Sequence, residues 1–421
     1  MIRIILIRHG RTAWNTGAGS SKRVRGTINV PLADEGVLQA QATAQRLASL
    51  PLSAVYSSPL QRAARTAQII AEPHSLVAQA LPDLSSMNYG QWAGQPYADV
   101  ARNWPDLYSQ WLHDPFSVQI PGGDSAAEHR DRAVRTLRAV LTRHSDGDTI
   151  TLVTHQVVTR ALVCVLAGLP NTAFWHFRQD LCNLSHFDYD PVSDRFTLVG
   201  LNDTCHLNPA LPHATNGGTR LLLIRHGQTA WNEGAGEARF RGRTDLPLDD
   251  AGWAQARAIS VRLRGESVAT LYTSPLLRAQ QTLTPLADDL GLPVHPHYGL
   301  LDIDYGGFQG LTYTEAATAH PELHTLWRTR PSQVRFPHGE SLVDVQARLV
   351  ALLEQLATRH PGETVALAGH QIVNKALACT LLHLSLDQIW RIQQDTGGID
   401  VFQQAGGDWS VLGLNDTCHL A

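Results

Sequence analysis

The 421-residue chain contains two copies of one long sequence unit. LIRHGRTAWNTGAG at residues 6–19 returns as LIRHGQTAWNEGAG at residues 223–236, with twelve of the fourteen positions identical, so that His9 recurs as His226, 217 positions later. Further pairs follow in the same order: SSPLQRA with TSPLLRA, THQVV with GHQIV, and GLNDTCHL repeated without change. A unit of this length can bury its own apolar core, which indicates domain duplication rather than a solenoid of short repeats.

The stretch between the two copies is NPALPHATNGG, residues 208–218. Its proline and glycine content is typical of a connection rather than of a helix or strand. We therefore expect one domain at 1–207, a linker at 208–218 and a second domain at 219–421.

Within each copy, strand patterns alternate with helix patterns. In the first copy the apolar runs predict strands over 2–7, 54–56 and 149–153, and the helical spacing of apolar residues predicts helices over 36–50, 60–71, 124–143 and 156–167. Alternation of this kind predicts an α/β fold with a mainly parallel sheet covered on both faces. The expected fold class is two tandem three-layer αβα sandwich domains.

Short polar motifs follow several of these strands. Arg8 and His9 end the first strand, Arg62 lies near the start of the helix after the second, and His155 follows the strand over 149–153. Because ligands bind at the carboxyl ends of strands in such sheets, we expect these side chains to converge on one pocket. The second copy would assemble the corresponding set: Arg225, His226, Arg278 and His370.

Two arginines and two histidines suit a phosphoryl group. Guanidinium forks match phosphoryl oxygens with charge-assisted hydrogen bonds. Nearby positive charges keep an imidazole neutral, and a neutral imidazole nitrogen can attack phosphorus to form a phosphohistidine. We therefore expect each copy to bind a phosphoryl group.

Composition excludes several other classes of protein. The formal net charge is −4, which argues against a nucleic-acid partner. The longest apolar run, residues 161–169, is too short to cross a bilayer, and the five cysteines include no C-x-x-C pair, so we expect a cytoplasmic protein with no membrane association and no metal site. The sequence leaves the oligomeric state open.

The extended LIRHG-x-TAWN context, present twice with the other motifs in order, resembles the histidine phosphatase superfamily, whose fold is called phosphoglycerate mutase-like. The resemblance covers essentially all of each copy and implies that His9 and His226 are the phosphorylated nucleophiles. It implies further that the remaining arginines and histidines complete the phosphate pockets, that Asn15 and Asn232 hydrogen-bond phosphate, and that no metal or other cofactor is needed.

The family also places a glutamate as proton donor four residues before a glycine, and here the copies differ. In the second copy that position is Asp302, with Asp304 as a further candidate, whereas the first copy has Ser86, and Asp83 is the nearest upstream acid. A serine cannot deliver a proton at a useful pKa. We therefore expect the second domain to be the stronger catalyst.

These observations predict a phosphomonoesterase that hydrolyses a small phosphorylated metabolite through phosphohistidine, chiefly in the second domain. Mutases of the family carry a long insertion before the second histidine, and the 28 positions from Gly94 to Gly122 leave no room for it, so hydrolysis is favoured over mutase-type phosphotransfer. The alternative for the first domain is a pseudo-enzyme that senses a phosphorylated ligand without turnover.

Overall fold

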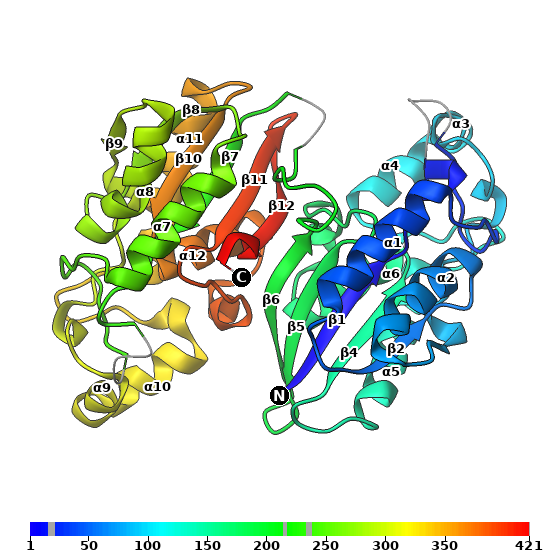
Figure 1. The fold of residues 1–421 in the computed structure, drawn as a ribbon, viewed down its shortest axis with the longest axis horizontal. Coiled ribbons are helices and arrows are strands. Elements are labelled where there is room, and N and C mark those ends of the chain that lie inside the picture. The colour runs from blue at the N-terminus through cyan, green and yellow to red at the C-terminus, as the bar shows by residue number, and fades with distance from the viewer. Residues whose placement is uncertain (16–21, 214–216, 233–237, 421) are drawn as a thin grey trace. The chain divides into compact units, whose positions relative to one another are not determined.

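The computed structural model describes residues 1–15, 22–213, 217–232 and 238–420. The chain forms two compact units, Met1–Pro209 and Ala210–Ala421, drawn in Figure 1. The boundary lies inside the segment expected to be a linker. Leu211, within that segment, is buried in the apolar core of the second unit, and its amide donates to Glu266 Oε1 at 2.8 Å, so this part of the connection is packed.

The first unit contains one mixed sheet in the order β3-β2-β4-β1-β5-β6. The strands are β1 (Ile2–Arg8), β2 (Leu52–Ser57), β3 (Gln79–Ala80), β4 (Thr149–Thr154), β5 (Leu184–Asp190) and β6 (Arg195–Asp203). The first four are parallel, and β5 and β6 are antiparallel to their neighbours. Arg8 pairs with Thr154 and Ser57 with Val153, so β1, β2 and β4 end at the same edge of the sheet.

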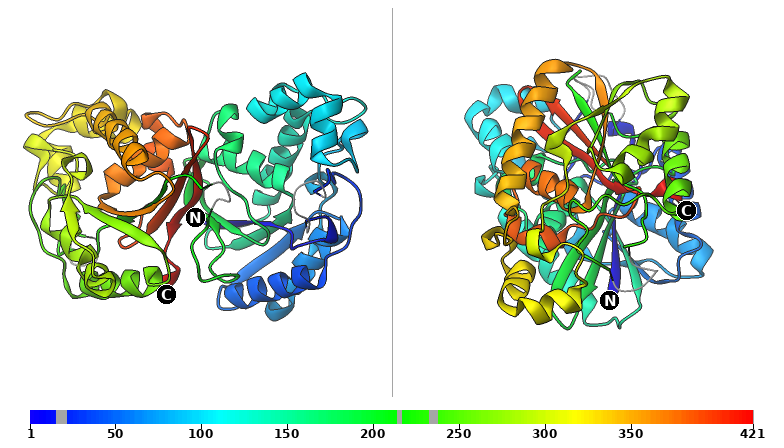
Figure 2. Two further views of the ribbon diagram at one scale, coloured as in Figure 1. Left: turned by 90° about the horizontal axis from the view of Figure 1, so that it is seen from above. Right: turned by 90° about the vertical axis from the view of Figure 1, so that its left-hand side faces the viewer.

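Helices cover both faces of this sheet (Figure 2). Helices α1 (Asp34–Leu47) and α2 (Gln61–Ala71) pack together on one face, and α5 (Ala126–Leu141) and α6 (Gln156–Ala167) pack together on the other. Two short helices, α3 (Tyr97–Asn103) and α4 (Pro105–His113), precede α5. The strands and helices expected from the periodicity are therefore present, and the fold class is confirmed as α/β.

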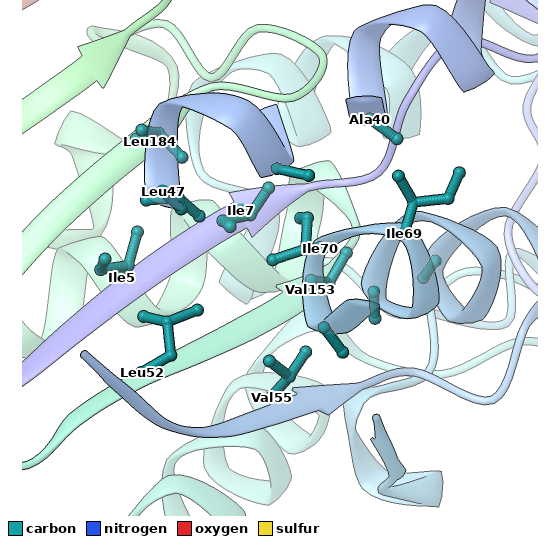
Figure 3. Packing of buried hydrophobic residues seen from close by; sticks show 14 residues of the cluster. Ile5, Ile7, Ala40, Leu47, Leu52, Val55, Ile69, Ile70, Val153 and Leu184 are labelled. Atoms are coloured by element: carbon teal, nitrogen blue, oxygen red, sulfur yellow. The ribbon is translucent and has the colours of Figure 1, made fainter. Parts of the chain in front are cut away.

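Successive side chains of β1 point to opposite faces of the sheet, and both faces are covered by helices. Figure 3 shows Ile5 and Ile7 beneath α1 and α2, packed with Leu47 and Ile70. Ile4 and Leu6 point to the opposite face, and both are fully buried. A strand that lies between two helix layers needs apolar residues on both faces, which produces a continuous apolar run.

The second unit repeats this architecture in the order β9-β8-β10-β7-β11-β12. Its strands are β7 (Arg220–Arg225), β8 (Val268–Thr273), β9 (Val294–Pro296), β10 (Thr364–Gly369), β11 (Ile399–Ala405) and β12 (Asp408–Asp416). Its helices are α7 (Asp250–Leu263), α8 (Leu277–Leu290), α9 (Tyr313–Ala319), α10 (Pro321–Thr329), α11 (Leu342–Arg359) and α12 (Gln371–Leu381). Among the described residues, no helix is long and apolar enough to cross a membrane.

Replacing Ile70 by alanine should lower the free energy of unfolding of the first unit by about 2–5 kcal/mol, because the substitution leaves a cavity between α2 and the sheet. Urea unfolding followed by circular dichroism measures this loss. Val192→Ala, at a side chain that is 95% exposed, is the matched control and should cost far less. Equal losses in the two variants would contradict this description of the core.

Candidate active sites

Strand register brings the two histidines of each unit side by side. In the first unit the amide of His9, which follows β1, donates to the carbonyl of Thr154 at 2.9 Å, and His155 is the next residue. The rings of His9 and His155 lie 5.3 Å apart between centroids. In the second unit the His226 amide donates to the Gly369 carbonyl at 3.0 Å. The rings of His226 and His370 there lie 5.2 Å apart.

A single hydrogen bond sets the tautomer of the first histidine in each pair. His9 Nδ1 lies 2.7 Å from the carbonyl oxygen of Gly10, and His226 Nδ1 lies 2.7 Å from that of Gly227. A carbonyl can only accept, so Nδ1 carries the hydrogen and the neutral ring presents the lone pair of Nε2. His226 Nε2 is buried and has no hydrogen-bond partner among the described residues. Nε2 is thus the atom available for attack on phosphorus.

Arg62 and Arg278 are held in place by backbone carbonyls. Arg62, on α2, is 1% exposed and donates from Nη1 to Ile28 and from Nη2 to Gly26, both at 2.8 Å. Arg278, on α8, makes the equivalent bonds to Thr244 and Gly242, also at 2.8 Å. Two anchored nitrogens fix the plane of each guanidinium, so little side-chain entropy would remain to be lost when a ligand binds.

The start of each of these helices is tied to a distant loop. The amide of Gln61, the first residue of α2, donates to Asn29 Oδ1 at 2.8 Å, and the amide of Leu277, the first residue of α8, donates to Asp245 Oδ1 at 2.6 Å. Such side chains satisfy amides that have no partner within the helix. They fix the helix turn that carries Arg62 or Arg278.

Burial and positive charge keep the imidazoles neutral. Burial, followed by Arg62 and Arg8, holds the pKa of His9 well below its usual range, and burial followed by Arg278 and Arg225 does the same for His226. The pKa of His155 and of His370 is also well below its usual range, again mainly through burial. The nucleophilic form of His9 and His226 is therefore present at neutral pH.

Arg8 and Arg225 contribute a second guanidinium to each pocket. Arg8 Nη1 donates to the Gln179 carbonyl at 2.7 Å, and Arg225 Nη1 donates to the Gln394 carbonyl at 2.5 Å. Burial lowers the pKa of each arginine to about 9, which still leaves both protonated at pH 7.

Asn15 and Asn232 make matching hydrogen bonds in the two units. Asn15 Oδ1 accepts from the amide and the hydroxyl of Thr12, at 3.0 and 2.8 Å, and Asn232 Oδ1 accepts from the amide and the hydroxyl of Thr229, both at 2.9 Å. These bonds orient the amide oxygen, so the NH₂ group is the part of each side chain that can donate to a phosphate.

A third arginine in each pocket was missed by the sequence analysis. The charge of Arg25 lowers the pKa of His9, Arg8 and Arg62, and the charge of Arg241 lowers that of His226, Arg225 and Arg278. Arg25 Nη1 donates to the Trp14 carbonyl at 3.2 Å, and Arg241 Nη1 to that of Trp231 at 2.9 Å. The repeated pattern R-G-x-x-[N/D]-x-P-L, at 25–32 and 241–248, was the signal that could have found them.

In the second unit a carboxylate joins the histidine pair. Asp302 is 6% exposed, with Oδ2 at 3.2 Å from Arg278 Nη2 and 3.8 Å from His370 Nδ1. Burial raises the pKa of Asp302 above its usual range against the opposing effect of Arg278 and Arg241. Asp304 instead accepts from the Gly306 amide at 2.9 Å and pairs with Arg243 at 3.3 Å. Of the two candidate acids, Asp302 is the one beside the histidines.

The first unit has Ser86 at the corresponding position, and that serine is 6% exposed. Asp83 is exposed, and its Oδ2 accepts from the Thr136 hydroxyl of α5 at 3.4 Å. Asn88, which corresponds to Asp304, accepts from the Gly90 amide at 3.0 Å. Asp83 therefore lies at the surface against α5 and makes its side-chain contact there, rather than with His9 or His155.

A buried acid, Asp400, holds the glutamine whose carbonyl accepts a hydrogen bond from Arg225. Both carboxylate oxygens of Asp400 lie 2.9 Å from Gln394 Nε2, and Asp400 Oδ1 accepts from the Asn415 amide at 2.8 Å. The carbonyl of Gln394 is the group that accepts from Arg225. In the first unit Ser185 takes the place of Asp400 and lies 3.0 Å from Gln179 Nε2. Burial raises the pKa of Asp400 from 3.8 to about 7.

We expect Asp400→Ser to flatten the pH dependence of stability in the second unit. An acid whose pKa is raised on folding binds its proton more tightly in the native state, so its contribution to stability is present below pH 4 and is lost as the pH rises towards 7. Urea unfolding at a series of pH values from 4 to 8 should show the unsubstituted chain losing more stability than the variant over this range. Parallel profiles would contradict the raised pKa.

Among the described residues, no three His, Cys, Asp or Glu side chains come together in a way that could hold a metal ion. Guanidinium and imidazole groups come together in both pockets, joined in the second by the Asp302 carboxylate.

Comparison with known proteins places both units in one family. The family model of the histidine phosphatase superfamily (branch 1) matches residues 4–204 and again residues 221–417. Phosphoserine phosphatase 1 of Hydrogenobacter thermophilus is 33% identical over 201 residues, which is 48% of this chain and 94% of that protein. The 2-carboxy-D-arabinitol-1-phosphatase of Triticum aestivum is 25% identical over 453 residues, covering 99% of this chain and 86% of that protein.

Among solved structures, a putative alpha-ribazole-5'-P phosphatase from Escherichia coli K-12 is 30% identical, covers 48% of this chain and 96% of that chain, and has a TM-score of 0.43. The two family matches together span most of the sequence. The chain therefore belongs to the histidine phosphatase superfamily, in two tandem copies, and is a phosphatase of that type.

Proposed function

We propose that the second unit hydrolyses small phosphomonoesters through a phosphohistidine on His226, and that the first unit binds phosphate but turns over slowly. The observation that carries the difference is Asp302, a buried carboxyl with a raised pKa 3.8 Å from His370. The first unit has a serine at that position.

The first half of the reaction transfers the phosphoryl group to the enzyme. His226 Nε2 attacks phosphorus, and the bond from phosphorus to the ester oxygen breaks. Arg225, Arg241 and Arg278 neutralise the charge on the other phosphoryl oxygens. Asp302 in its protonated form, which burial favours by raising the carboxyl pKa, gives its proton to the departing alkoxide, which leaves as an alcohol.

The second half returns the enzyme to its starting state. Asp302, now a carboxylate, takes a proton from water as that water attacks the phosphorus of phosphohistidine. The bond between phosphorus and Nε2 breaks, inorganic phosphate forms, and Nε2 recovers its lone pair. Asp302 is protonated again and ready for the next ester.

Two observations support a small phosphomonoester as the substrate class. The named relatives are phosphatases of phosphoserine and of 2-carboxy-D-arabinitol 1-phosphate, both small phosphorylated metabolites. The segment between Gly310 and Gly339 holds only α9, α10 and a single 3₁₀ turn, which supports access by water and hence hydrolysis.

His226→Ala in the full chain should abolish most turnover of a phosphomonoester panel, whereas His9→Ala should leave most of it, because within the described parts of the chain a carboxylate lies beside the histidines of the second unit and not beside those of the first. Steady-state assays that include p-nitrophenyl phosphate, phosphoserine and sugar phosphates measure this division. Equal losses in the two variants would contradict the assignment of turnover to the second unit.

Asp302→Asn should reduce kcat/KM for an alkyl phosphate by about 10²–10⁴-fold, the usual contribution of acid–base catalysis. The loss should be much smaller for p-nitrophenyl phosphate, since a stable phenolate leaves without a proton. Asp304→Asn is the matched control and should change either value little. A similar loss on both substrates would indicate a binding role for Asp302 instead.

Ser86→Asp in the His226→Ala background should raise the turnover of alkyl phosphates by the first unit, because it supplies the missing carboxylate. Ser85→Asp, at the adjacent position, controls for added charge. A Ser86→Asp chain that folds and binds phosphate but gains no activity would show that the first unit lacks more than its acid.

A further inference from the structure

The first unit contains a buried histidine that has no counterpart in the second. His129 lies on α5 and is 1% exposed. Helices α5 and α11 begin in the same way, with Ser125 and Ser341 as capping residues that accept from the amide three positions later. Counting from these caps places His129 opposite Val345, which is fully buried.

Hydrogen bonding determines which nitrogen of His129 carries the hydrogen. Arg132 Nη2 lies 2.5 Å from His129 Nδ1, and a guanidinium can only donate. Nδ1 is therefore the acceptor. Burial, then Arg132, lowers the pKa of His129 to about 4, so the ring is neutral at pH 7 and Nε2 bears the hydrogen. That Nε2–H group is buried and has no hydrogen-bond partner among the described residues.

A buried donor without a partner costs free energy, so a ligand oxygen that accepts from this N–H group would remove that cost. Helix α5, which carries His129, packs against α6, and α6 begins directly after His155. Helix α5 also packs against the 3₁₀ turn over Pro82–Leu84, which leads directly to Ser86. His155 Nδ1 is likewise buried and without a partner in the described structure.

The two units also differ in the residues around Ser86 and its counterpart Asp302. In the second unit Arg348, the counterpart of Arg132, donates to the carbonyls of Gly299 and Asp302 and pairs with Glu340. It thereby supports the segment that carries the acid. In the first unit Arg132 is turned to His129 instead. Loss of the carboxylate, gain of a histidine and redirection of the arginine thus occur together.

We propose that His129 Nε2–H donates a hydrogen bond to an oxygen of a phosphorylated ligand in the first pocket, which makes that pocket a receptor for phosphate rather than a hydrolytic centre. This inference rests on the proposed binding of phosphate by the first unit. A neutral imidazole N–H can hold a phosphoryl oxygen but cannot protonate a leaving group, since it would have to become an imidazolate. Replacing a carboxylate by this donor also removes a charge that repels a dianion.

The test uses the full chain with Arg225→Ala and Arg278→Ala, which disable the second phosphate pocket, and titrates inorganic phosphate by calorimetry. Adding His129→Val, the residue of the second unit, should weaken phosphate binding roughly 10-fold or more, as expected for loss of a hydrogen bond to a charged group. His129→Gln keeps an N–H donor and should recover part of the affinity. Thr136→Val, elsewhere on α5, is the control and should leave the affinity unchanged.

The outcomes separate this inference from the proposed function. If the background chain binds no phosphate, phosphate binding by the first unit is wrong. If it binds phosphate and His129→Val leaves the affinity unchanged or higher, the role of His129 is overturned. Should near-ultraviolet circular dichroism show that His129→Val is unfolded, His129→Gln compared with His129→Ala decides: equal affinities in the two would overturn the proposal, and tighter binding by His129→Gln would support it.

Discussion

The hydrogen bond from the His9 amide to the Thr154 carbonyl, and its counterpart from His226 to Gly369, is the constraint on which each site depends. Parallel pairing of the two strands places one histidine directly beyond each strand end, so their rings lie next to one another at the edge of the sheet. A slip of one residue in this pairing would move His9 away from the end of β4, and so away from His155. The same packing that stabilises the sheet therefore holds the histidines together.

Around each histidine pair, the charged side chains are held in place mainly by hydrogen bonds to backbone groups. Carbonyl oxygens hold the guanidinium groups of Arg62 and Arg278 in place. Carbonyl oxygens also set the tautomer of His9 and His226. Backbone acceptors position a cation without neutralising its charge, although Arg278 has Asp302 as an additional carboxylate partner. The guanidinium charges thus remain available to phosphate while they keep the imidazoles neutral. Against this shared background, the proposed difference between a hydrolytic site and a binding site rests on the residue beside the histidines, Asp302 in the second unit and Ser86 in the first.

Much of this arrangement could be predicted from sequence, because the repeat and the strand ends carry strong local signals. Other parts could not. Arg25 and Arg241 lie in irregular segments, where a repeated pattern marks both positions but no periodicity shows which way a side chain points. The choice between Asp302 and Asp304 depends on which carboxylate faces the turn and which faces His370. His129 lies on an arginine-rich helix whose pattern is typical of a solvated surface, and only packing shows that it is buried.

The most direct test is to trap the covalent intermediate. The full chain is mixed with a phosphomonoester, quenched in alkali to preserve acid-labile phosphate on histidine, digested and mapped by mass spectrometry. The mechanism predicts phosphate on Nε2 of His226, and its absence from that peptide in His226→Ala. An active chain with no phosphate on His226 under any quench time, or with equal labelling in His226→Ala, would contradict phosphohistidine catalysis in the second unit.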